Sequence, residues 1–190
     1  MNDGGWGEYG IVRRLFEWFK VQPLPPSPDV LHEETLKIIW LGQDKQWKTY
    51  RRIAARWLME ASPGALDALA LLGETIWEGR QGIYARPGVG VLYDEESVVG
   101  LLSGFLDERF KGFYIEHLVA HPKYSEVVQG RIRELLVNGA IDVSIANGQH
   151  GWVSCASTTE TYSQWRGLGF STEEKLPGAG VYMSKMGYFR

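Results

Sequence analysis

The chain has 190 residues, 44% of them hydrophobic and 23% charged, which suits one core-forming domain with an extension. Its net charge of −3 provides no basic footprint for nucleic-acid binding, and its apolar stretches fall well short of the roughly 20 residues that a membrane span needs. The one cysteine, Cys155, excludes an intramolecular disulfide and a thiolate zinc cluster. Since Met1–Gly10 carries no leader pattern, we expect a cytoplasmic protein without a metal site.

The first 30 residues are expected to form an arm distinct from the domain at residues 31–190. Ile11–Val21 has the apolar spacing of an amphipathic helix, and four prolines between residues 23 and 28 predict a stiff extended linker. Such a helix cannot bury its apolar face locally. We therefore expect residues 1–28 to contact the domain, a protein partner or a second copy of the chain.

The middle of the chain changes from helical to β-rich patterning. Leu31–Leu41 is compatible with a short strand or a helix end, and Lys45–Ala61 and Ala65–Trp77 are predicted helices separated by a break at residues 62–64. Three strands joined by short charged turns follow, at Val89–Tyr93, Ser97–Leu106 and Gly112–His121. Short turns between consecutive strands favour an antiparallel meander.

The last third alternates helices and strands. Glu126–Asn147 has helical spacing and ends at a glycine, and Trp152–Cys155 is predicted to be a buried strand. Ser157 and the two threonines after it are expected to cap a short helix that ends at Arg166. The final strands are expected at Phe170–Glu174 and Val181–Met186. The fold class is thus α+β, in three α/β layers: a mixed central sheet between flanking helices.

This element order resembles the GNAT superfamily of N-acetyltransferases. The resemblance depends on the strand ending in Leu118–Pro122, the helix after it, the buried strand Gly151–Cys155, and the run Tyr162–Phe170 with its Gly-Phe ending. It covers about half of the chain, from about Gly88 onward. It implies a splayed parallel strand pair, an acetyl-CoA cleft between those strands, and an amine acceptor that is a small molecule or a protein.

The resemblance also implies the cofactor-binding residues. The pantetheine arm would pair with the strand, and the pyrophosphate would meet a Gly-rich loop at a helix N-terminus. The family loop pattern aligns with Val127–Ile132, or two residues earlier with Ser125–Gly130, and both alignments are degenerate. We therefore expect acetyl-CoA to be bound, but not tightly. The residues expected to bind it are Leu118, Val119, Ala120, Val128, Gln129, Gly130, Arg131 and Ile132.

The strand before that loop, Gly112–His121, contains two candidates for the catalytic base. By strict alternation Glu116 shares a face with Leu118 and Ala120, and His117 lies on the other face, so one of the two should face the cleft. We prefer Glu116 as the base, as the resemblance implies. In the family, a tyrosine that acts as the general acid usually occupies the position of Trp165, and a tryptophan has no titratable proton for this role. Tyr162, one turn earlier on the helix, is the predicted substitute.

The alternative function is a catalytically silent GNAT-like domain used for protein assembly. The degenerate loop, Trp165 and the tryptophan-rich N-terminal arm favour it.

Overall fold

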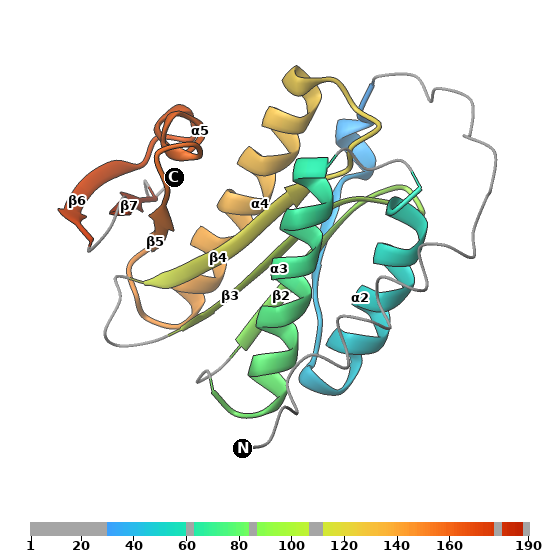
Figure 1. Ribbon diagram of the computed structural model, residues 1–190, viewed down its shortest axis with the longest axis horizontal. Coiled ribbons are helices and arrows are strands. Elements are labelled where there is room, and N and C mark those ends of the chain that lie inside the picture. Colours follow the sequence, from blue (N-terminus) through green and yellow to red (C-terminus); the bar gives the residue numbers. More distant parts are fainter. Residues whose placement is uncertain (1–29, 60–62, 84–86, 107–111, 177–179, 188–190) are drawn as a thin grey trace, which may run out of the picture.

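The computed structural model describes residues 30–59, 63–83, 87–106, 112–176 and 180–187. The predicted N-terminal helix and its proline-rich linker lie outside the described residues, so the contacts expected of residues 1–28 stay a prediction. Within the described part, a seven-stranded sheet has the order β1-β2-β3-β4-β5-β7-β6 (Figure 1). Its strands are β1 Lys37–Trp40, β2 Pro87–Asp94, β3 Ser97–Leu106, β4 Phe113–Ala120, β5 Trp152–Ser157, β6 Ser171–Lys175 and β7 Val181–Met186. The helices are η1 Glu33–Thr35, α2 Gln43–Trp57, α3 Pro63–Arg80, α4 Glu126–Ala146 and α5 Tyr162–Gly167.

The predicted fold class is confirmed. The meander β1-β2-β3-β4 is antiparallel, β4 and β5 run parallel, and the remaining pairs are antiparallel. Figure 1 shows α2 and α3 on one face of the meander and α4 on the opposite face. Two apolar cores result. One lies between the sheet and α2 and α3, and the other lies between the sheet, α4 and α5.

Several element ends differ from the prediction. Pro63 begins α3 instead of ending a helix, because a proline's fixed φ and missing N–H suit the first helical turn. β5 continues through Ser157, so this residue does not cap α5. The turn before α5 is instead tied by hydrogen bonds between Thr158 and Thr161. The segment Leu31–Leu41 contains η1 and the edge strand β1.

A β-bulge in β4 changes the direction of the side chains around Glu116. Ser103 of β3 pairs with His117 and the next residue, Gly104, pairs with Ile115, so Glu116 is the extra residue of β4. A bulge bends its strand and reorients the side chains beyond it. Strict alternation therefore fails between Ile115 and His117.

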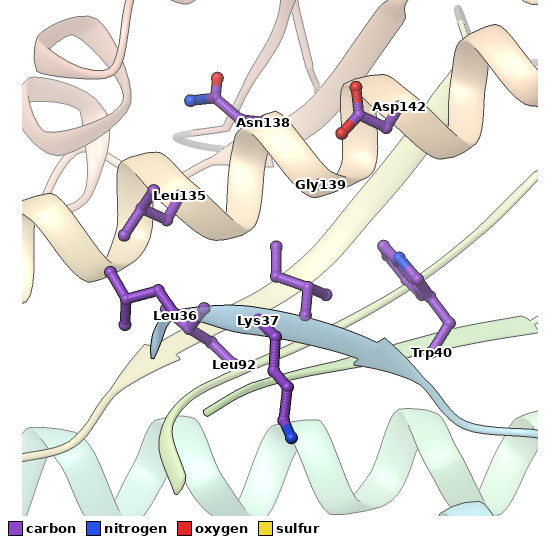
Figure 2. Close-up of a pocket in the computed structure, with 9 residues that line it drawn as sticks. Leu36, Lys37, Trp40, Leu92, Leu135, Asn138, Gly139 and Asp142 are labelled. Atoms are coloured by element: carbon purple, nitrogen blue, oxygen red, sulfur yellow. The ribbon is translucent and has the colours of Figure 1, made fainter. Parts of the chain in front are cut away.

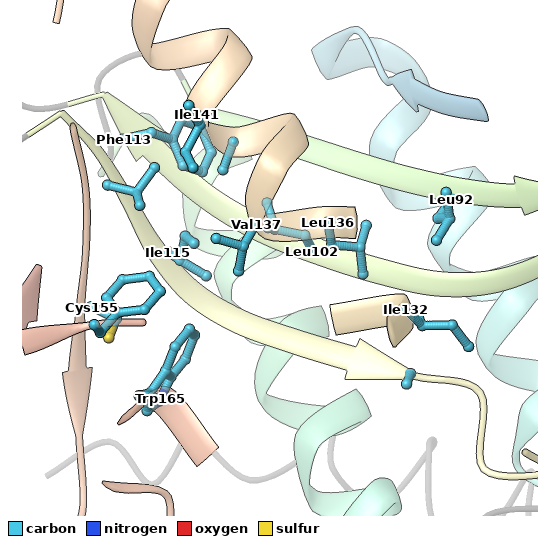
Figure 3. Packing of buried hydrophobic residues seen from close by; sticks show 14 of the residues in the cluster. Leu92, Leu102, Phe113, Ile115, Ile132, Leu136, Val137, Ile141, Cys155 and Trp165 are labelled. Atoms are coloured by element: carbon cyan, nitrogen blue, oxygen red, sulfur yellow. The ribbon is translucent and has the colours of Figure 1, made fainter. Parts of the chain in front are cut away.

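The second core closes around α5. The described core residues there include Ile115, Val137, Cys155 and Trp165 (Figure 3). Trp165 is 6% exposed and packs edge-on against Phe170, with the ring centroids 5.0 Å apart. Cys155 is fully buried and free, as expected for a small apolar filler.

Candidate active site

The two parallel strands β4 and β5 separate part of the way along their length. Their described pairing covers three residues of each strand and ends at Ile115 and Cys155. Beyond this pair β4 runs on to Ala120, still paired with β3, and β5 runs on to Ser157, still paired with β7. The separation begins beside the bulge at Glu116, which supplies the bend. A strand edge that has lost its neighbour can pair with an extended ligand.

Glu116 lies on the α3 side of the sheet. Its carboxylate Oε2 accepts a hydrogen bond from Thr75 Oγ1 of α3 at 2.8 Å. Leu118 and Ala120 instead pack toward the core that contains α4. The expectation that Glu116 shares their face is therefore wrong, because the bulge shifts the alternation by one residue.

His117 and Tyr114 flank Glu116 on β4. Burial lowers the pKa of His117 to about 4, although Glu78 of α3 acts in the opposite direction. Burial, with a smaller contribution from the Glu116 charge, raises the pKa of Tyr114 to about 12. The Tyr114 hydroxyl is hydrogen-bonded to the backbone of Ala156, the first residue of β5 beyond its last pair with β4. No sequence motif singles out Tyr114, and only the strand register reveals its place.

A cavity of about 560 Å³ lies between α4, α5 and β7. Its lining comprises Gly130, Arg133, Glu134, Gln164, Gly167, Leu168, Gly169 and Lys185. Arg133 donates to Gln129 Oε1 at 2.8 Å, and Lys185 Nζ donates to the Leu168 carbonyl at 2.9 Å. The cavity lining thus combines two cations, one carboxylate and three glycines. Such a lining suits an anionic ligand.

The start of α4 distinguishes between the two loop alignments. Ser125 is the N-cap of α4, and its Oγ accepts from the Val128 N–H. Gly130 lines the cavity, and a Cβ added there would have no heavy atom within 4 Å. Ile132 is 0% exposed and points into the core beside Gly100, so its side chain does not crowd the cavity. The structure therefore favours the alignment that ends at Gly130.

Other predicted binding residues are differently engaged. Arg131 is 42% exposed and pairs with Glu134 at 2.7 Å and Glu33 at 3.3 Å, whereas Arg133 is 19% exposed and lines the cavity. The side chain of Val119 packs into the core beside α2 and α3, which leaves its backbone as the group available for pairing. Gln129 donates from Nε2 to the Tyr124 carbonyl at 2.8 Å.

The predicted acid Tyr162 is not brought beside Glu116. Its side chain is 36% exposed, and its hydroxyl lies 3.0 Å from Thr172 Oγ1. Trp165, one turn later, is buried in the core instead. The structure thus brings Glu116 together with Tyr114 and His117, three residues of one strand.

A second hollow, of about 390 Å³, lies between β1 and α4 (Figure 2). Figure 2 shows Leu36 and Trp40 of the β1 region opposite Leu135 and Asp142 of α4. This hollow contains none of the residues that flank the separated strands, so it is not the active-site candidate.

Neither a cluster of potential metal ligands nor a helix able to cross a membrane occurs among the described residues.

Comparison with known proteins identifies the fold. No protein-family model matches the chain, and no protein of curated function matches it in sequence. Solved structures do match. A GNAT-family acetyltransferase from Desulfovibrio desulfuricans aligns with a TM-score of 0.54 and 14% identity, over 80% of this chain and 98% of that one. The PaiA N-acetyltransferase from Thermoplasma acidophilum, in complex with coenzyme A, aligns with a TM-score of 0.52 and 13% identity, over 80% of this chain and 98% of that one. A dodecameric spermidine N-acetyltransferase from Vibrio cholerae aligns with a TM-score of 0.51 and 13% identity, over 80% of this chain and 94% of that one. The chain therefore has the GNAT fold.

Proposed function

We propose that this protein is an N-acetyltransferase that transfers an acetyl group from acetyl-CoA to an amine. The observation that carries the proposal is the separation of β4 and β5 beyond Ile115 and Cys155. Glu116 lies on the α3 face of the sheet, and the cavity between α4, α5 and β7 lies on the α4 face. The coenzyme A complex of the PaiA neighbour supports the choice of cofactor.

The residues present fit coenzyme A. The open side of Gly130 allows close approach to the backbone of α4, and a helix N-terminus favours phosphate. Arg133 and Lys185 would meet the anionic part of the cofactor. The unpaired edge of β4 from His117 to Ala120 would pair with the amide-bearing arm. When bound, the cofactor supplies an acetyl group activated as a thioester.

Glu116 is the proposed general base. An amine acceptor is an ammonium ion near neutral pH and must lose a proton before it can act as a nucleophile. The Glu116 carboxylate, anchored to α3 by Thr75, would accept that proton. For a proton donor we propose Tyr114 in place of the predicted Tyr162, whose hydroxyl lies beside Thr172. A phenol whose pKa is raised to about 12 keeps its proton at neutral pH, and Tyr114 lies where the strands separate.

Isothermal titration of the full chain with acetyl-CoA tests this proposal. We expect saturable binding, followed by release of coenzyme A thiol when spermidine or another primary amine is added. Spermidine is the first acceptor to try because it is named for one structural neighbour. No binding at millimolar acetyl-CoA would overturn the proposal and would favour the silent, assembly-type alternative.

A further inference from the structure

We propose that Thr75 of α3 is a positioning residue that keeps Glu116 ionised and fixed at the separation of β4 and β5. This inference rests on the proposed function for its catalytic meaning. The hydrogen bond itself can be tested without any substrate.

The bulge of β4 creates the contact. Without it, Glu116 would share a face with Leu118 and Ala120, which pack toward the core beside α4. The extra residue turns Glu116 toward the opposite face of the sheet, where α3 lies. A carboxylate that enters a partly apolar layer must find a donor, since burying it unpaired is costly.

Thr75 is suited to be that donor. It is 4% exposed, and its Oγ1 lies 2.8 Å from Glu116 Oε2 but 3.3 Å from the carbonyl of Leu71. A threonine hydroxyl has one proton, and in a helix it ordinarily bonds the carbonyl four residues earlier. Here that local bond is the longer of the two. The Thr75 hydroxyl therefore donates its proton in a hydrogen bond to the ionised Glu116, because hydrogen bonds to a charged acceptor are shorter and stronger.

The surroundings contain further titratable groups. Among the described residues, β4 contributes Tyr114 and His117, and α3 contributes Glu78, one turn beyond Thr75. Cys155 of β5 and Tyr182 of β7 also contribute to the raised pKa of Tyr114. Glu78 is a like charge on the same helix. A donor at Thr75 favours the charged form of Glu116 and opposes the effect of burial.

The test is a carboxyl-carbon NMR titration of the full chain labelled with ¹³C-glutamate, in which Glu116→Gln identifies the Glu116 signal. We expect Thr75→Val to raise the pKa of Glu116 by about one unit, a tenfold change in its ionisation constant, because a hydrogen bond to the charged form is lost. Thr75→Ser, which keeps the hydroxyl, should restore the titration of the parent chain. Thr75→Ala provides a second hydroxyl-free variant if the valine does not fold.

Thr35→Val is the matched control. Thr35 Oγ1 donates to Asp94 at the same 2.8 Å, in a different part of the molecule. Its loss should leave the Glu116 titration unchanged. An unaltered Glu116 pKa in folded Thr75→Val or Thr75→Ala, or an equal shift in Thr35→Val, would overturn the inference.

The activity readout separates this inference from the proposed function. In spermidine acetylation, Thr75→Val should shift the acidic limb of the pH profile of kcat/KM to higher pH. The shift should equal the rise in the pKa of Glu116 measured by NMR. If the parent chain binds no acetyl-CoA, the proposed function fails, while the NMR titration still decides whether Thr75 controls Glu116.

Discussion

Ile115 of β4 and Cys155 of β5 form the last pair at which the two parallel strands lie side by side. The next residue of β4 is the bulged Glu116, and the next residue of β5, Ala156, is hydrogen-bonded to Tyr114. The candidate chemistry is thus gathered within two residues of the point where the strands part.

Replacement of Glu116 by Gln should remove the proposed base while preserving the size of the side chain. We expect the rate of spermidine acetylation to fall by about 10²-fold or more, with acetyl-CoA affinity changed little. Steady-state kinetics and titration calorimetry measure the two quantities. Equal rates for the variant and the parent chain would exclude Glu116 as the base.

The two tyrosines can be separated by single hydroxyl deletions. Tyr114→Phe should lower kcat by about tenfold or more, because its hydroxyl lies at the separation of the strands. Tyr162→Phe should change kcat less than twofold, because that hydroxyl lies beside Thr172 on the exposed edge. The reverse order of effects would return the acid role to Tyr162.

Two neighbouring arginines of α4 form a matched pair. Arg133 lines the cavity, whereas Arg131 is bound to two glutamates on the outside of the helix. Arg133→Ala should weaken acetyl-CoA binding by roughly tenfold, and Arg131→Ala by less than twofold. Calorimetry at low and high salt checks both. Equal losses would indicate that the cavity is not the anion site.

His121 should make the stability of the fold depend on pH. Burial first, and then the Lys123 charge, lower the pKa of His121 to about 4, and its Nδ1 accepts from the Lys123 N–H at 3.2 Å. Between pH 6.5 and about 4 the unfolded chain therefore binds more protons at this histidine than the folded chain does. The free energy of unfolding should fall by up to about 1.4 kcal/mol for each pH unit of acidification in this window.

Urea denaturation at pH 7 and pH 5 measures that slope. His121→Gln should reduce it, and the exposed control His150→Asn should leave it unchanged. A slope that survives in His121→Gln would assign the effect to other groups, with the half-buried His117 first among them.

Two glycines test opposite packing environments. A Cβ at Gly100 would lie 2.6 Å from Ile132 Cγ2 and 2.8 Å from Leu136 Cδ1, so Gly100→Ala should destabilise the fold by about 1–3 kcal/mol. Gly130→Ala should stabilise it by up to about 1 kcal/mol, since the position is helical and open. Chemical denaturation gives both values. A loss of stability in Gly130→Ala would show that something covers this face of α4.

The sequence by itself determined the order and type of most elements. Periodicity located α2, α3, α4 and the strands β2, β3 and β4, since each repeats its apolar residues with the period of its own backbone. The segment that contains β1 stayed open between a strand and a helix end. The motif residues around Pro122 and Gly169 were sufficient to indicate the GNAT fold and to select Glu116.

Only the tertiary structure decided how those residues face one another. The bulge inverts the side of the sheet on which Glu116 lies, and no local pattern announces an unpaired residue whose partner strand is elsewhere in the sequence. For the same reason Thr75, Tyr114 and Lys185 escaped prediction, although each belongs to a correctly located element. Their roles come from contacts between elements, which propensity and periodicity within one element do not encode.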